Sequence, residues 1–217
     1  MRERPILFSG QMVRAILEGR KSQTRRPVKF PPAPMNLGTW EPNTIGGPGT
    51  YLDKACTHPD DRPARTVMWH TRNGATVGYP YGQPGDRLWV RETWQVVKAD
   101  ANPPRVWYRA DPGVEDCVAK SLVGWQGWRP AIHMPRAACR LVLEVTDVRV
   151  EKLQEISDED AEAEGVELQG GAALWPHINR GDKMKSAYRD LWDSLNAKRA
   201  PWSSNPWVWV ISFRRIP

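Results

Sequence analysis

Cysteine and phenylalanine are scarce in this chain, with three residues of each among 217. A small, odd number of cysteines in a chain of this length excludes a disulfide scaffold and favours a reducing, cytoplasmic setting. No apolar run approaches the roughly 20 residues that a membrane helix needs, so we expect no membrane partner. The start of the chain leads into only three apolar residues, Ile6 to Phe8, and we expect no signal peptide.

Several catalytic signatures are also missing. The sequence contains no GxxxxGK[ST], no GxGxxG after a strand, no GxSxG and no HExxH, which removes support for phosphate-loop, dinucleotide-binding, hydrolase-elbow and zinc-protease functions. Cys56, His58 and His70 could supply three zinc ligands, but no convincing fourth ligand and no CxxC pair accompany them. We therefore expect neither a metal nor a cofactor.

Tryptophan and positive charge are abundant: the chain has 12 Trp and a net charge of +6. Residues 1–30 hold eight basic groups against two acids, whereas residues 144–167 hold ten acids against two bases. A basic surface beside one acidic patch can attract phosphate and leave the acids for another task. Ordinary solvated surface charge is the alternative.

Residue patterns predict several strands and two or three helices. The strands are expected at 6–8, 88–97, 105–109, 139–150 and 207–213, and the helices near 10–18, from 157 to 165 and at 183–196. Ser9 and Ser157 are expected helix caps, and Gly165 the end of the second helix. The apolar phase of strand 139–150 reverses at Thr146 and Asp147, which predicts a bulge or sharp bend there.

The order of these elements favours an α+β fold. Strands and helices alternate too irregularly for a parallel doubly wound sheet, so we expect a small mixed β-barrel in a single domain over residues 1–217. Residues 31–50 contain five Pro and four Gly. The stretch 31–80 is therefore interpreted as an insertion or a long ordered loop, with a hairpin as a further option.

The polar loop at 19–26 carries the most chemistry. Lys21 and Thr24 are three residues apart, and Arg20, Arg25 and Arg26 surround them. A lysine removed from water can lose its proton near neutral pH and act as a base. A threonine hydroxyl becomes a nucleophile when such a base takes its proton, and the arginines would favour a phosphate or a polarised carbonyl. A basic loop without a catalytic role is the alternative.

This loop, GRKSQTRR at 19–26, resembles the GxKxxTxR signature of ASCH (activating signal cointegrator homology) domains. Residues 85–92 (GDRLWVRE), 153–165 (LQEISDEDAEAEG) and 207–215 resemble the later blocks of that family, in the same order. The resemblance implies a PUA-like mixed β-barrel with two or three flanking helices, a cleft facing a nucleobase or nucleic acid, and insertions at about 31–80 and 110–130. Chains with this whole layout resemble bacteriophage and prophage proteins, which implies the host cytoplasm.

One bacterial branch of the family consists of N4-acetylcytidine amidohydrolases. The resemblance maps their catalytic Lys, Thr and Glu onto Lys21, Thr24 and Glu164, with Glu162 as the neighbour if the alignment shifts. It implies metal-independent removal of an N-acyl group from a modified cytosine nucleoside or nucleic acid. Lys21 would take the proton of Thr24, Glu164 would orient the substrate amide or Lys21, and Arg26 or backbone N–H groups would stabilise the oxyanion.

Two other functions stay open: a non-catalytic RNA-binding or nucleic-acid-binding ASCH module, and an RNA-cleaving ASCH enzyme with Lys21 as its base. The expected partner is a modified nucleoside, RNA or single-stranded nucleic acid, and the sequence leaves the oligomeric state open. The expected substrate-binding residues are Arg20, Arg25, Arg26, Trp89, Arg91 and Glu92. Glu92 could instead pair with a basic residue for structural reasons.

The tryptophans divide into core and candidate binding residues. Trp192 lies in an amphipathic stripe, and Trp207 and Trp209 lie in a strand that is apolar on both faces, so these three are expected in the core. In a regular strand Trp89 and Trp94 point to opposite faces. We expect Trp89 to face the cleft because it lies within the second block.

Overall fold

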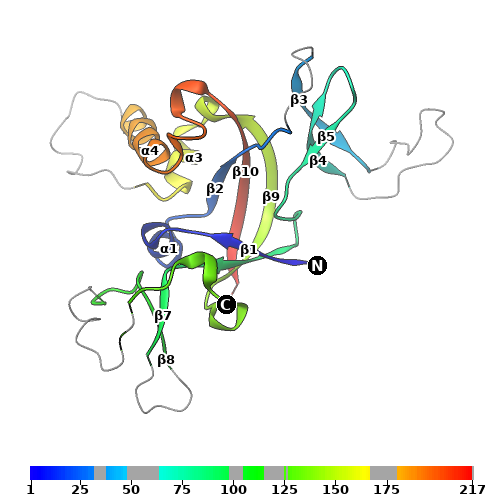
Figure 1. Ribbon diagram of the computed structural model, residues 1–217. Helices are drawn as coiled ribbons and strands as arrows, with labels where there is room; N and C mark the ends of the chain where they lie inside the picture. Colours follow the sequence, from blue (N-terminus) through cyan, green and yellow to red (C-terminus); the bar gives the residue numbers. More distant parts are fainter. Residues whose placement is uncertain are drawn as a thin grey trace.

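The computed structural model describes residues 1–31, 38–47, 64–97, 105–114, 125, 127–166 and 180–216. These residues form a mixed α+β structure with three sheets and three α-helices (Figure 1). The largest sheet has the order β1–β6–β9–β10–β2, in which β1 and β6 are parallel and the other neighbours antiparallel. Its strands are β1 (Glu3–Leu7), β2 (Gln23–Pro27), β6 (Arg87–Arg91), β9 (Val142–Lys152) and β10 (Trp207–Ile216).

Two smaller antiparallel sheets accompany the large one. The first consists of β3 (Trp40–Ile45), β4 (Arg65–His70) and β5 (Thr76–Gly78), all within the predicted insertion at 31–80. The second pairs β7 (Trp94–Val97) with β8 (Arg105–Tyr108). No helix of the described segments is long and apolar enough to cross a membrane.

The three helices confirm the predicted ones, with small shifts at their ends: α1 (Gly10–Leu17), α3 (Asp158–Ala163) and α4 (Arg180–Asn196). Both predicted caps are present. The Ser9 hydroxyl accepts a hydrogen bond from the Met12 N–H at 3.4 Å, and the Ser157 hydroxyl accepts one from the Asp160 N–H at 3.1 Å. Each cap satisfies a donor that the first turn of a helix otherwise leaves free.

The predicted bulge in β9 is confirmed. Ser212 of β10 pairs with Asp147, whereas the next residue, Phe213, pairs with Val145. Thr146 is therefore an extra residue on β9, and a bulge of this kind bends its strand and increases the local twist. It bends the two longest strands of the large sheet.

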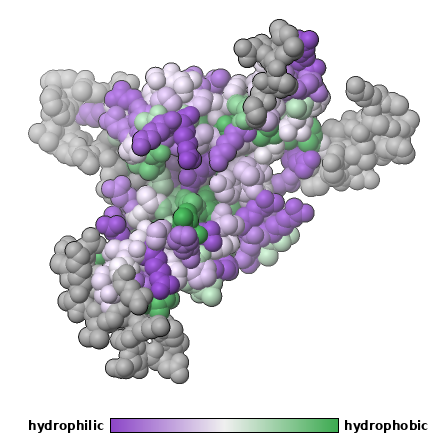
Figure 2. All heavy atoms as spheres, viewed as in Figure 1, coloured by the Kyte–Doolittle hydropathy of each residue, from purple (hydrophilic) through white to green (hydrophobic). Residues whose placement is uncertain are grey.

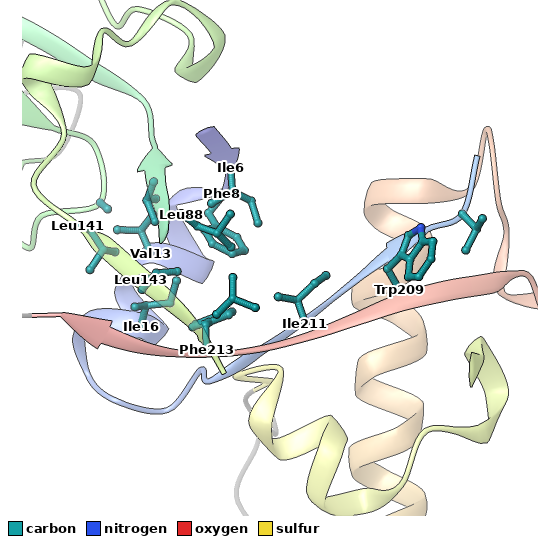
Figure 3. Packing of buried hydrophobic residues seen from close by; sticks show 14 of the residues in the cluster. Ile6, Phe8, Val13, Ile16, Leu88, Leu141, Leu143, Trp209, Ile211 and Phe213 are labelled. Carbon is teal, nitrogen blue, oxygen red and sulfur yellow. The ribbon is translucent and has the colours of Figure 1, made fainter. Parts of the chain in front are cut away.

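The large sheet curls around the main apolar core. Arg26 of edge strand β2 donates a hydrogen bond to the Leu7 carbonyl of the opposite edge strand, β1, at 2.6 Å. The two edges thus approach each other without pairing as strands, so within the described residues the expected barrel does not close. We call the line along which β1 and β2 face each other the seam. Figure 3 shows the enclosed core, with labelled residues from β1, α1, β6, β9 and β10 and from the segments beside them.

A second apolar cluster lies where α3 and α4 pack beside β10. Trp192 is 2% exposed and donates its indole N–H to the Ala200 carbonyl at 2.7 Å. Trp209 is also 2% exposed, which confirms both residues as core. Trp207 is only half-buried, and Lys152 lies 4.4 Å from the centre of its ring.

The prediction of one continuous strand over 88–97 is wrong. The chain leaves the large sheet after Arg91 and enters the separate β7–β8 pair at Trp94. Glu92 at the break is 1% exposed and forms an ion pair with Arg140. Three consecutive polar residues, Arg91 to Thr93, mark this break in the sequence.

Candidate functional site

Lys21 and Glu164, which are far apart in the sequence, form a buried ion pair. The Lys21 Nζ donates to the Glu164 Oε2 at 2.7 Å and to the Glu164 main-chain carbonyl at 2.8 Å. The side chains are 0% and 3% exposed, and their backbones form an isolated β-bridge. The structure thus brings together the first predicted block and the end of the acidic helix.

Gly165 explains how the end of α3 comes so close to Lys21. Its φ is +77°, a conformation that residues with a Cβ rarely adopt. A Cβ at this position would lie 2.8 Å from the Lys21 Cβ and 2.9 Å from the Ala15 Cβ. Glycine is therefore required both for the chain reversal after α3 and for the close packing that supports the ion pair.

Arg25 extends the pair into a larger ionic cluster. It donates to the Glu164 Oε1 at 3.3 Å, to the Asp160 Oδ2 at 2.7 Å and to the Glu151 Oε1 at 3.0 Å. Arg149 donates to the same Asp160 oxygen at 2.6 Å and to the Glu151 Oε2 at 3.2 Å. Part of the acidic stretch thus neutralises the basic loop. Arg25, an expected substrate-binding residue, has a fully buried side chain that is occupied by these carboxylates.

The surroundings of Lys21 reduce its affinity for a proton. Burial lowers the pKa of Lys21 below its ordinary value, and the neighbouring guanidinium groups of Arg26 and Arg25 lower it further, against the opposing effect of Glu164. Burial acts to raise the pKa of Asp160, but hydrogen bonds from neighbouring side chains, those of Arg25 and Arg149 among them, outweigh it, and that pKa is lowered. A lysine with a lowered pKa loses its proton, and so becomes available as a base, at a lower pH than a solvent-exposed lysine.

Thr24, the third expected catalytic residue, lies on β2, three residues after Lys21 in the chain. Within the described residues its hydroxyl forms no hydrogen bond with Lys21 or Glu164. Strand alternation puts Thr24 on the same face of β2 as Arg26, whose guanidinium lies 5.3 Å from the centre of the Phe8 ring. The Lys21 Nζ lies 5.9 Å from that same ring. Thr24 is 2% exposed, so substrate can reach it only after the side chains that cover it move.

The other expected substrate-binding residues are more dispersed. Arg20 pairs with Glu18 at the surface and donates to the Gly165 carbonyl at 3.3 Å. Trp89 is 9% exposed, and the Arg91 guanidinium lies 4.8 Å from the centre of its ring. No hydrogen bond or ion pair of the described residues joins Trp89 or Arg91 to the Lys21 cluster.

Glu92 has the structural pairing that the sequence left open. Arg140 donates two hydrogen bonds to its carboxylate, at 2.9 and 3.0 Å. Arg140 also donates to Asp111 at 2.5 Å and lies 3.9 Å from the centre of the Tyr108 ring. Burial raises the pKa of Glu92, although Arg140 opposes this effect.

Two polar residues at the seam, Arg4 and Tyr79, are not among those that the sequence predicts for the site. Arg4 donates to the Pro80 carbonyl at 2.5 Å. Tyr79 packs on Trp209 with ring centres 5.6 Å apart, and burial raises the pKa of its hydroxyl well above the usual range. Residues 4 and 79 belong to no motif, and only the curl of the sheet brings them towards Arg26.

The suggested zinc ligands are not assembled in the described part of the chain. Cys56 and His58 lie outside it, whereas His70 is 5% exposed and packs edge-on against Trp40. The described residues contain no group of three His, Cys, Asp or Glu side chains placed to hold a metal ion.

Comparison with known proteins gives no family for this chain: no family model, curated protein or solved structure matches it. The chemistry of the site therefore has to be inferred from its residues. A buried lysine with a lowered pKa lies beside a carboxylate, and a buried threonine and a half-buried arginine are near it. Such a set can provide a base, a hydroxyl nucleophile and a positive charge.

Proposed function

We propose that this chain is an ASCH-type domain with a PUA-like fold that hydrolyses the N-acyl group of a modified cytosine, as in N4-acetylcytidine. The observation that carries the proposal is the buried contact between the Lys21 Nζ and the Glu164 Oε2 at 2.7 Å. It joins two of the four sequence blocks that resemble ASCH domains, and these two contain the residues that match the catalytic set of the amidohydrolase branch. The curled five-stranded sheet, whose edges approach each other at the Arg26–Leu7 hydrogen bond, supports the PUA-like fold.

The proposed reaction proceeds from the uncharged form of Lys21, which its lowered pKa makes easier to reach from the ion pair; in that form it accepts the proton of the Thr24 hydroxyl. The Thr24 oxygen forms a bond to the acyl carbon, and the negative charge on the former carbonyl oxygen is stabilised by Arg26 or by backbone N–H groups. The bond between that carbon and N4 then breaks, and Lys21 returns the proton to the leaving amine. Water hydrolyses the acyl-threonine ester, releasing the carboxylic acid and restoring the Thr24 hydroxyl.

Glu164 has a positioning role in this scheme. It holds the Lys21 Nζ through one carboxylate oxygen and receives Arg25 through the other. This arrangement fixes the lysine in place, while burial favours its uncharged state. Glu162, the alternative in the sequence alignment, is exposed on α3, so the scheme assigns it no role.

The test is hydrolysis of N4-acetylcytidine, and of N4-acetylcytidine in RNA and DNA oligonucleotides, by the full chain. Lys21→Met, Thr24→Ala and Glu164→Gln should each lower kcat/KM by at least about 100-fold, the scale expected of general-base and nucleophile losses. Lys29→Met, Thr44→Ala and Glu162→Gln make matched changes at exposed positions and should retain activity.

A wild-type chain inactive on all of these substrates would refute the amidohydrolase proposal. RNA binding without any reaction would then favour the binding module. Cleavage of labelled RNA in the presence of EDTA would favour the RNA-cleaving enzyme.

A further inference from the structure

Arg25 and Arg26 are neighbours on β2 but have opposite surroundings. Alternation along the strand sends their side chains to opposite faces. Arg25 contacts three carboxylates. Arg26 forms no ion pair with any described residue: it donates to the Leu7 carbonyl and lies over the Phe8 ring. Among the described residues, therefore, no carboxylate pairs with the positive charge of Arg26 at the seam.

A second arginine and a phenol approach the same place. Trp209 of β10 is directly opposite Arg26 in the strand register, so the two side chains are on the same face. The Tyr79 ring packs on Trp209 at 5.6 Å between centres. From the other edge of the sheet, Arg4 donates to the carbonyl of Pro80, the residue after Tyr79. Arg4 also has no carboxylate partner among the described residues.

Two hydrogen-bonding atoms at the seam are buried and have no partner in the described part of the chain: the Arg26 Nε and the Tyr79 hydroxyl. A buried donor without an acceptor is destabilising, because it has lost its bond to water. Acceptor oxygens of a bound anion would satisfy both donors. Phosphate fits best, because its several charged oxygens can receive hydrogen bonds from two guanidinium groups and a hydroxyl at once.

The surface around the seam is suited to a ligand that is part apolar and part charged. Leu7, at the end of β1, is 43% exposed. Figure 2 shows a hydrophobic area at the centre of this face, with hydrophilic groups around it. Thr24 lies two residues before Arg26, and the rise along a strand separates their Cα atoms by about 7 Å. A base near Thr24 can thus belong to the same ligand as a phosphate near Arg26.

We propose that the seam binds the phosphate of a phosphorylated cytidine through Arg4, Arg26 and the Tyr79 hydroxyl. The cytosine part of this inference rests on the proposed function, whereas the phosphate part does not. The assignment leaves the oxyanion of the hydrolysis step to backbone N–H groups. The phosphate can be a terminal monoester of a nucleotide or an internal diester of a polynucleotide.

Calorimetric titration of the full chain with four probes tests the proposal: inorganic phosphate, cytidine, cytidine 5′-monophosphate and the dinucleotide cytidylyl-cytidine. At least one phosphorylated cytidine should bind about tenfold more tightly than cytidine, the scale of one charge-assisted hydrogen bond. Preference for the monophosphate identifies a nucleotide site, and preference for the dinucleotide identifies a polynucleotide site.

Variants then locate the phosphate. Arg26→Gln and Arg4→Gln should each remove most of the tenfold preference, and Tyr79→Phe should reduce it while keeping the ring on Trp209. Arg215→Gln removes the same charge from an exposed position six residues further along β10 than Trp209, about 20 Å away, and should keep the preference. Arg4→Gln keeps the test valid if Arg26→Gln fails to fold.

The two proposals fail separately. Equal affinities for cytidine and both phosphorylated forms would overturn the phosphate site even if the chain hydrolyses N4-acetylcytidine. An equal loss of preference in Arg215→Gln would also overturn it, because general electrostatic attraction would then explain the binding. Phosphate binding that depends on Arg26 and Arg4 in a chain without hydrolase activity would support this inference and refute the proposed function.

Discussion

The ion pair between Lys21 and Glu164 can be measured directly through its effect on stability. The perturbation is a double-mutant cycle in which Lys21→Met and Glu164→Gln are made singly and together. Each single change leaves one member of a buried pair without its partner, because the two side chains are 0% and 3% exposed. Breaking a buried pair in this way costs about 3–5 kcal/mol, since the charge that is left has lost both water and its partner.

The contacts that remain in each single variant put its expected loss of stability at the low end of that range. In Lys21→Met, Glu164 still receives Arg25 at 3.3 Å. In Glu164→Gln, the Lys21 Nζ still has the main-chain carbonyl at 2.8 Å. We therefore expect about 3 kcal/mol for each single variant. The double variant removes both charges and should also cost about 3 kcal/mol, which gives a coupling energy of about 3 kcal/mol.

Urea unfolding of the four proteins measures this coupling. The control cycle uses Lys29→Met and Glu159→Gln, which make the same changes at exposed positions and should be additive within about 0.5 kcal/mol. A coupling for Lys21 and Glu164 as small as that of the control would refute the reasoning, because the two charges would then not sense each other in the folded protein.

Three further predictions concern stability. Gly165→Ala should destabilise the protein by at least about 2 kcal/mol in urea unfolding, because the new Cβ meets Ala15 and Lys21 while φ is positive. Since the pKa of Lys21 is lowered by folding, the unfolded chain binds more protons, and stability should rise with pH between the folded pKa and about 10.4. Lys21→Met should remove that rise, and parallel pH profiles of the two proteins would contradict the assignment. Arg140→Gln leaves the buried Glu92 carboxylate without its two hydrogen bonds and should cost about 3 kcal/mol, whereas an effect below about 0.5 kcal/mol would contradict a structural role.

Short-range sequence patterns predicted the structural features that depend on residues close together in the chain. The helix caps at Ser9 and Ser157 and the bulge at Thr146 were identified because each depends on residues within a few positions along the chain. The polar run Arg91 to Thr93 is a local sign of the end of β6, but the residue that holds Glu92 there, Arg140, is 48 residues away and could not be identified from the sequence. The open seam was also missed, since strand patterns do not show whether a sheet closes.

The candidate site was predictable to a similar extent. The motif resemblance named Lys21 and Glu164 as members of one site, with contact between them as one of two options, and the structure places them in contact. It did not separate Arg25 from Arg26, because only the fold shows that one faces carboxylates and the other faces the seam. No sequence pattern indicated Tyr79, because it reaches the seam only by packing on Trp209 of a strand that is distant in the sequence.

The proposed hydrolysis requires Thr24 to attack an N-acyl group after Lys21 takes its proton. The most direct measurement mixes excess chain with N4-acetylcytidine, quenches the reaction at short times and analyses the peptides by mass spectrometry. We predict transient acetylation of the peptide that contains Thr24 together with release of cytidine, and neither in Thr24→Ala or Lys21→Met. Release of cytidine that persists in Thr24→Ala, or no release by the wild-type chain, would contradict the account.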